Sequence, residues 1–243
     1  MSRILIWDLP TRLFHWFFAL AFTAAYVLGE EERWLGWHTY FGYLAGGLVL
    51  FRLIWGLVGG QYSRFSAFPP NPRAGARYLK SLIGGQGEHH VGHNPAGALA
   101  IYALLLLGLA TAISGVALLG ADKALGPLAG VIPNRWEDVL KEVHEFCANT
   151  MLALVLLHVL GVLVGSLSHK ENLPRAMVTG YRESHGRQLA GVGPAPVVAL
   201  LLLAGVALFS ALHDFTGGCG DNPAACTEAS THEGHEGRGR HDD

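Results

Sequence analysis

Four histidines have the type and the placement to do chemistry inside a membrane. They lie within or at the ends of long apolar segments of the chain, at His15, His38, His144 and His158. Ionisable side chains are rare in membrane-spanning segments, and those that occur usually mark a functional site. A single such histidine would be explained equally well as a hydrogen-bond partner between helices. Four of them in three segments favour a shared functional role.

The other histidines need no special role. They lie in connections, at helix ends or in the C-terminal tail, and His93 belongs to the polar stretch "EHHVGH". Short histidine-rich stretches of this kind sometimes bind metal ions. We expect solvated side chains at these positions rather than ligands.

Five apolar segments are long enough to cross a bilayer. Of the 243 residues, 51% are hydrophobic and only 15% are charged, whereas soluble domains carry about 25% charged residues. A bilayer core about 30 Å thick needs roughly 20 mostly apolar residues per helix. The segments of suitable length lie near residues 13–29, 36–58, 96–120, 146–167 and 195–212. We therefore predict an all-α membrane protein with a four-helix transmembrane bundle and a fifth transmembrane helix.

Two patterns beside these segments predict additional helical structure. Residues 134–143, "NRWEDVLKEV", carry apolar side chains three to four positions apart, so the fourth spanning helix should begin before it enters the bilayer. Residues 72–85, "PRAGARYLKSLIGG", are basic and amphipathic. A helix of this composition is expected on the membrane surface, with membrane lipid as a partner.

The distribution of positive charge predicts the topology. The N-terminus and the second and fourth connections are basic, whereas the first connection, "GEEERWLG", is acidic. The positive-inside rule places the basic regions in the cytoplasm. The N-terminus is then cytoplasmic, and five crossings would put the C-terminus outside. The net charge of -2 gives no reason to expect a nucleic-acid partner.

This topology places the four histidines at two depths. His15 and His158 fall on the cytoplasmic side, and His38 and His144 fall on the outer side. His144 and His158 are fourteen residues apart, which is about 21 Å along a helix and brings both side chains to one face. We therefore expect an outer pair, His38 with His144, and an inner pair, His15 with His158.

Two histidines at each depth suit haem better than a bare metal ion. Zinc usually takes three or four protein ligands, whereas haem supplies four equatorial nitrogens and needs only two axial ligands. Two haems, one at each depth, therefore account for both pairs. Glycines near the histidines would leave room for them, although small residues also occur wherever membrane helices pack closely. These glycines are Gly42, Gly46, Gly47 and Gly161.

Two arginines are candidate partners of the haem propionates. Arg52 lies fourteen residues after His38, on the same face and at the inner depth, and Arg12 lies one turn before His15. A cation at either position could pair with a carboxylate of the cofactor. A positive-inside residue at a helix end explains each of them equally well, so both alternatives stay open.

Three stretches of the chain resemble the bacterial di-haem cytochrome b561 family, which includes the b-type cytochrome subunits of membrane-bound nickel–iron hydrogenases. They are "WDLPTRLFHW", "HTYFGYLAGGLVLFRLIWG" and "VHEFCANTMLALVLLHV", and the resemblance covers about the first 180 residues. It implies a four-helix core in the bacterial inner membrane, two haem b groups and electron exchange with the quinone pool. It also implies that the axial ligands are His15, His38, His144 and His158.

The leading hypothesis is a transmembrane di-haem cytochrome that transfers electrons between quinone and a periplasmic redox partner such as a c-type cytochrome. Haem with two histidine ligands has no open axial position, which suits electron transfer. One alternative is the membrane-anchor cytochrome b subunit of a hydrogenase or other multi-subunit oxidoreductase, with an oxidoreductase subunit as partner. A proton-coupled transporter would favour acidic residues within the spans, and almost none are present. No catalytic residue is assigned.

The chain divides into three expected regions. Residues 1–180 form the di-haem core, residues 181–213 a cytoplasmic linker and the additional helix, and residues 214–243 a polar periplasmic tail. The tail holds Cys219 and Cys226, and an oxidising compartment would permit a disulfide between them. The additional helix and the tail depart from the usual core of the family.

Overall fold

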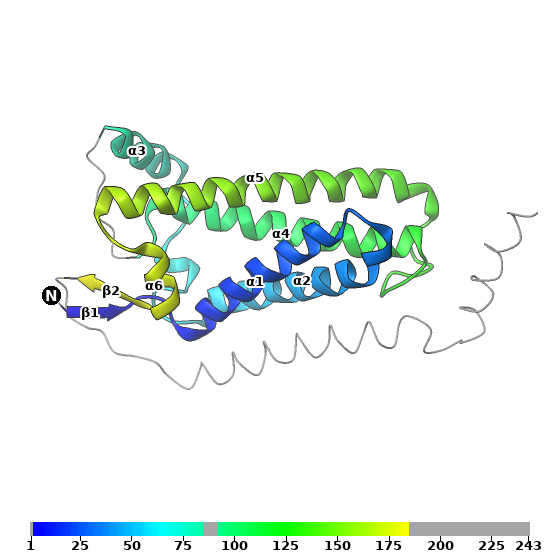
Figure 1. Ribbon diagram of the computed structural model, residues 1–243, viewed down its shortest axis with the longest axis horizontal. Coiled ribbons are helices and arrows are strands. Elements are labelled where there is room, and N and C mark those ends of the chain that lie inside the picture. Colours follow the sequence, from blue (N-terminus) through cyan, green and yellow to red (C-terminus); the bar gives the residue numbers. More distant parts are fainter. Residues whose placement is uncertain (1, 85–91, 185–243) are drawn as a thin grey trace, which may run out of the picture.

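The computed structural model describes residues 2–84 and 92–184 (Figure 1). Four long helices make up most of this part: α1 (Leu9–Leu28), α2 (Leu35–Val58), α4 (Pro95–Asp122) and α5 (Glu137–His169). The predicted helix near residues 195–212, the tail and its two cysteines lie outside the described residues.

The remaining elements are short. They are the strands β1 (Ser2–Leu5) and β2 (Tyr181–Ser184), the helices α3 (Pro72–Ile83) and α6 (Leu173–Thr179), and the 3₁₀ turns η1 (Glu32–Trp34), η2 (Phe65–Ala67) and η3 (Asn134–Trp136). The helix at α3 agrees with the amphipathic pattern in the sequence.

The protein is an all-α, multi-pass membrane protein. Within the described residues, four helices are long and apolar enough to cross a bilayer. Their outward surfaces are apolar, with Leu57 72% exposed and Leu106 69% exposed, as expected where lipid rather than water surrounds the bundle. The prediction that the fourth spanning helix begins early is confirmed, because α5 starts at Glu137 and has 33 residues. That length corresponds to about 50 Å, well beyond a hydrocarbon core of about 30 Å.

The N-terminal end of α1 is fixed by one carboxylate. Asp8 caps the helix by accepting a hydrogen bond from the backbone N–H of Thr11. The same carboxylate accepts hydrogen bonds from Trp55 Nε1 and Ser63 Oγ. Because Trp55 lies in the last turn of α2, these bonds join the start of α1 to the end of α2.

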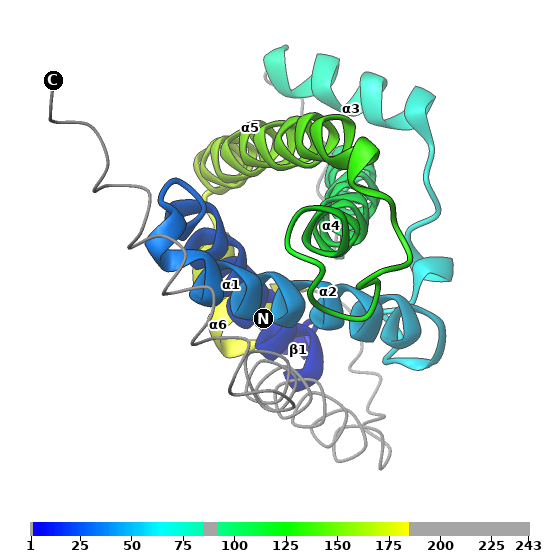
Figure 2. The ribbon, with the colours of Figure 1, turned by 90° about the vertical axis from the view of Figure 1, so that its right-hand side faces the viewer.

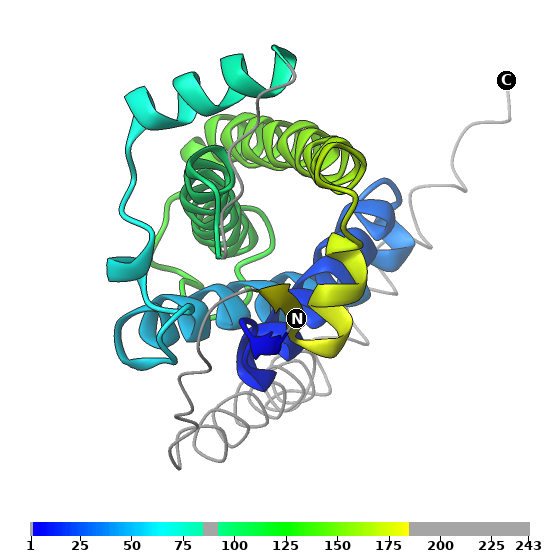
Figure 3. The same cartoon turned by 90° about the vertical axis from the view of Figure 1, so that its left-hand side faces the viewer.

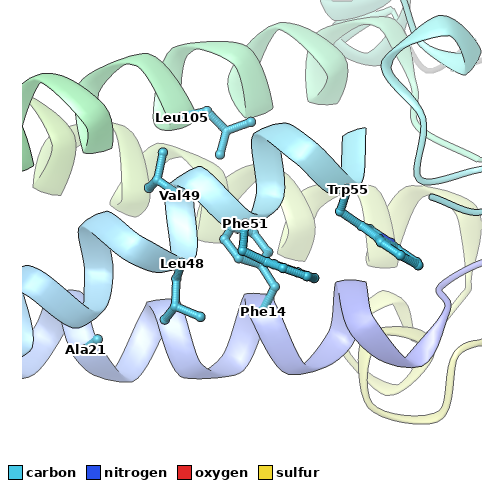
Figure 4. Close-up of a cluster of buried hydrophobic side chains, with 7 residues drawn as sticks. All are labelled: Phe14, Ala21, Leu48, Val49, Phe51, Trp55 and Leu105. Atoms are coloured by element: carbon cyan, nitrogen blue, oxygen red, sulfur yellow. The ribbon is translucent and has the colours of Figure 1, made fainter. Parts of the chain in front are cut away.

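The four long helices are arranged around a common interior, as the end-on views in Figures 2 and 3 show. α1 packs closely on α2, α2 on α4, and α4 on α5. A cluster of buried side chains holds α1, α2 and α4 together (Figure 4): Phe14, Ala21, Leu48, Val49, Phe51, Trp55 and Leu105. α1 and α5 are not among the closely packed pairs, so the side of the bundle between them is wider than the others.

One end of the bundle holds a small sheet. β1 and β2 pair antiparallel, with Leu5 opposite Tyr181, and Figure 1 shows them beside α6 at the end where α1 begins. We call this the sheet end. The pairing holds residues 2–5 and 181–184 on the same side, as four crossings between them require.

Candidate functional site

The structure brings the four histidines together in two pairs, the same two that the sequence predicts side by side. The rings of His38 and His144 have centroids 6.0 Å apart, and those of His15 and His158 have centroids 6.4 Å apart. The pair predicted as the inner one lies toward the sheet end, because His15 is in the second turn of α1 and His158 is in the second half of α5. In each pair a histidine of α5 lies beside a histidine of another helix, which is α2 for His144 and α1 for His158.

Hydrogen bonds hold both rings of the outer pair. His38 donates its Nδ1–H to the backbone carbonyl of Ala25 at 2.7 Å. His144 donates its Nδ1–H to the backbone carbonyl of Thr111 at 3.0 Å, and Ser114 Oγ lies 3.2 Å from the same nitrogen. Since a carbonyl oxygen only accepts, Nδ1 carries the proton in both rings, and Nε2 keeps a lone pair that can bind a metal.

A cavity surrounds the outer pair. His38 and His144 both line it, and so do the small residues Gly42, Gly108 and Gly115. α1, α2, α4 and α5 all contribute to its walls, which are mostly apolar. A Cβ atom added at Gly42, in the wall formed by α2, would meet no atom within 4 Å. The glycine therefore leaves space in the cavity that any other residue would fill.

The inner pair has a different environment. Nδ1 of His15 is buried and finds no hydrogen-bond partner in the described part of the chain. The same is true of Arg12 Nε and Arg52 Nη1. Three such nitrogens toward one end of the bundle are unusual, because each costs about 1–3 kcal/mol in lost hydration.

The two arginines are placed differently from simple surface cations. Arg52 is only 3% exposed, and its guanidinium lies 5.0 Å from the centre of the Phe65 ring. Arg12 donates from Nη1 to the carbonyl of Val178 at 2.6 Å. A positive-inside residue at a helix end normally extends to water, and Arg52 does not.

The comparison with protein families identifies the chain. The sequence model of the prokaryotic cytochrome b561 family matches residues 6–180 of the chain. The chain belongs to this family. It is also similar to a probable Ni/Fe-hydrogenase B-type cytochrome subunit from Rhodobacter capsulatus, with 20% identity over 74% of this chain and 82% of that protein. A probable Ni/Fe-hydrogenase B-type cytochrome subunit from Azotobacter vinelandii is 25% identical over 74% of this chain and 89% of its own length. No solved structure gives a significant match.

A cytochrome of this family carries haem b, and the histidine pairs fit that group. A metal–imidazole bond is about 2 Å long, and the nitrogen lies about 1.1 Å from the ring centre, so two axial imidazoles should have centroids about 6.3 Å apart. The observed separations are 6.0 Å and 6.4 Å. Within residues 2–84 and 92–184, no group of three or more His, Cys, Asp or Glu side chains could hold a bare metal ion.

Several residues of the cytochrome's outer site are not evident from the sequence. They are the carbonyls of Ala25 and Thr111, the Ser114 hydroxyl, and the glycines Gly29 and Gly115, which lie against the imidazole rings. Both glycines stand four residues after the residue whose carbonyl accepts the imidazole proton. That spacing is readable in the sequence, but its meaning depends on which helix faces each histidine.

Two glycines expected to make room for haem have different surroundings. A Cβ added at Gly46 would lie 3.0 Å from Ala112 Cβ, so this glycine allows α2 and α4 to approach closely. A Cβ at Gly161 would meet no atom within 4 Å. The sequence left two explanations for these glycines, room for haem or close helix packing, and the structure favours close packing for Gly46.

His93 is not the solvated loop residue that the sequence suggests. Its ring lies 4.2 Å from the ring of Phe68 and 4.5 Å from that of Trp7, centroid to centroid. Burial, and secondarily the charge of Arg52, lower the pKa of His93 from 6.5 to about 3. His93 is therefore a neutral packing residue at the sheet end. His89 and His90 lie outside the described residues.

Proposed function

We propose that this chain is a di-haem b membrane cytochrome that serves as the membrane-anchor subunit of an oxidoreductase of the nickel–iron hydrogenase type. It would pass electrons between an oxidoreductase subunit on the outer side and quinone in the membrane. The observation that carries the proposal is the pair of facing imidazoles at two depths, with ring separations of 6.0 Å and 6.4 Å.

The axial ligands in this proposal are His38 with His144 for the outer haem, and His15 with His158 for the inner haem. Haem held by two histidines supplies reversible one-electron chemistry without an open axial position. The protein's part is to hold the imidazoles, to exclude water and to balance charge. The apolar walls of the outer cavity would exclude water. Arg12 and Arg52 would balance the charge of the inner haem.

The unpaired nitrogens support the assignment of Arg12 and Arg52 to the inner haem. Each guanidinium has a buried N–H group that finds no acceptor among residues 2–84 and 92–184. A haem carries two propionate groups, and a carboxylate is the acceptor that a guanidinium binds most strongly. The propionates would therefore satisfy donors that are otherwise costly to bury.

The relatives support a subunit of a larger enzyme over a free-standing carrier. The two similar proteins are named as B-type cytochrome subunits of hydrogenases, and this chain spans 82% and 89% of their lengths. The second candidate is a carrier between quinone and a periplasmic c-type cytochrome, which uses the same two haems. Affinity purification of the tagged chain from its native membrane distinguishes the two. We expect metal-containing oxidoreductase subunits in stoichiometric amount; recovery of the cytochrome alone would favour the carrier.

The proposed location is the bacterial inner membrane, with the sheet end in the cytoplasm. The basic N-terminus and the basic α3 support this orientation, and the β1–β2 pairing supports an even number of crossings between them. Residues 1–180 would then form the di-haem core, 181–213 a linker and a fifth crossing, and 214–243 a periplasmic tail. A reporter enzyme fused after Asp243 should be active only in the periplasm.

Haem analysis of the purified, full-length protein tests the central proposal. A pyridine haemochrome assay should give two haem b groups per chain, and the oxidised protein should show two low-spin signals by electron paramagnetic resonance. One haem per chain would overturn the di-haem assignment. A colourless protein would overturn the function.

A further inference from the structure

The two rings of the outer pair are held by the same local arrangement in two different helices. The imidazole of His38 lies against α1 at Ala25 and Gly29, and that of His144 lies against α4 at Thr111 and Gly115. In each case a carbonyl accepts the Nδ1–H bond. In each case a glycine stands four residues after that carbonyl, one turn further along the helix.

The glycines are needed for space and not for backbone conformation. A Cβ added at Gly29 would lie 3.0 Å from Nδ1 of His38, and one at Gly115 would lie 2.8 Å from Cε1 of His144. Gly29 has φ -74° and ψ -14°, which any residue can adopt, and Gly115 lies within regular helix. A helix carbonyl already accepts the N–H of the residue four positions later. Only a residue without a side chain at that position lets an imidazole reach the same oxygen.

We propose that Gly29 and Gly115 are positioning residues that set the electronic character of the outer axial ligands and so give the outer haem the lower midpoint potential of the two. The inference rests on the proposed di-haem function. Donation of Nδ1–H to a carbonyl makes the imidazole a more basic ligand, and a more basic axial ligand stabilises ferric over ferrous iron. Both outer imidazoles have this bond.

The inner pair lacks this arrangement. Nδ1 of His15 is buried without a partner, and His158 has no hydrogen bond to any residue in the described ranges. The inner imidazoles are therefore weaker electron donors. Arg12 and Arg52, which the proposed function assigns to the inner haem, act in the same direction, because positive charge favours the reduced, less positive iron. A lower potential outside and a higher one inside is the order that favours electron movement from an outer partner to the inner face.

Redox titration of the full-length, haem-loaded protein, followed by its visible spectrum, tests the proposal. The wild type should show two midpoint potentials. Gly29→Ala and Gly115→Ala should each raise the lower one and leave the upper one unchanged. We expect about a tenfold change in the ferric–ferrous equilibrium, equivalent to about 59 mV for one electron. Gly36→Ala is the matched control, because it lies in α2 two residues before His38 and its Cβ would meet no atom within 4 Å.

A third variant tests the proposal even if the methyl group added at Gly29 or Gly115 expels the haem. Ser114→Ala removes the hydroxyl 3.2 Å from Nδ1 of His144 without adding bulk, and it should raise the lower potential by a smaller amount. An unchanged lower potential in all three variants, or a shift of the upper one, would overturn the proposal. A wild-type protein without two haems would instead overturn the proposed function.

Discussion

In the outer pair both imidazole rings are held by carbonyl groups of neighbouring helices, whereas in the inner pair neither ring has a hydrogen bond within the described residues. His38 is fixed by Ala25 and His144 by Thr111. Toward the sheet end, where the inner pair lies, His15 Nδ1, Arg12 Nε and Arg52 Nη1 are buried without a hydrogen-bond partner among the described residues. Two pairs of the same residue type, on the same bundle, are therefore supported in different ways.

The two pairs differ in whether the polypeptide alone, or the polypeptide together with a bound cofactor, would hold the imidazole rings in place. At the outer site the polypeptide itself fixes the tautomer and the direction of both rings, so the two imidazoles are preorganised without a cofactor. At the inner site the unpaired donors cost about 1–3 kcal/mol each, and a cofactor with carboxylate groups would remove that cost. The inner end should therefore depend on haem for its stability more than the outer end does.

Removal of single histidines should have the largest effect. In the proposed assignment, His38→Ala and His144→Ala each remove a ligand of the outer haem, and His15→Ala and His158→Ala each remove one of the inner haem. The four variants should form two spectroscopic classes, each with one low-spin haem kept and the other lost or converted to high spin. Haem quantitation and electron paramagnetic resonance measure this. A His15 variant with the signals of the His144 class would contradict the pairing.

Filling the outer cavity should remove the outer haem alone. Gly42→Leu places a branched side chain where a Cβ meets no atom within 4 Å, in the wall of the cavity. Haem content should fall toward one per chain, and the remaining signal should match that of the His144 variants. Gly36→Leu on the same helix is the control and should keep both haems. Equal haem content in the two variants would mean that this cavity does not hold the cofactor.

Loss of the buried cation should change the inner site only. Arg52→Met keeps the length and apolar character of the side chain but removes the charge, so the inner midpoint potential should fall. We expect about a tenfold change in the ferric–ferrous equilibrium, or about 59 mV, with the outer potential unchanged. Arg73→Met, an exposed cation on α3 at the same end, should have no effect. An equal fall of the inner midpoint potential in Arg73→Met would mean that Arg52 acts only as one of several positive charges at this end of the protein.

Acid should weaken the sheet end by a smaller amount. The folded protein holds His93 with a pKa of about 3 against 6.5 for an ordinary histidine, so it binds fewer protons than the unfolded chain between these values. The contribution to stability is complete above about pH 6.5 and decreases as the pH falls, by at most about 1.4 kcal/mol per pH unit. Thermal unfolding followed by haem absorbance should show this slope. His93→Phe should flatten it, and an unaltered slope would assign the acid sensitivity to other groups.

The sequence was sufficient for the parts of the fold that depend on local composition. The four described spanning helices follow from apolar length, the early start of α5 from the spacing of apolar residues, and α3 from its amphipathic pattern. The pairing of residues 2–5 with 181–184 was not predicted, because a four-residue strand has little local signal and its partner is far away in the sequence. His93 was expected in solvent because its neighbours in the sequence are polar, and its aromatic contacts come from distant residues.

The sequence by itself determined which four histidines lie in or beside the spanning helices and which of them come together in pairs. The spacing of fourteen residues between His144 and His158 fixes two depths on one helix face, since a helix rises 1.5 Å and turns about 100° per residue. Only the tertiary structure decided how each pair is supported. A hydrogen bond from an imidazole to Ala25 or Thr111 requires two helices to approach at a glycine, and that approach depends on how α1, α2, α4 and α5 pack together. The asymmetry between the outer and inner pairs is therefore a property of helix packing, which no local sequence pattern specifies.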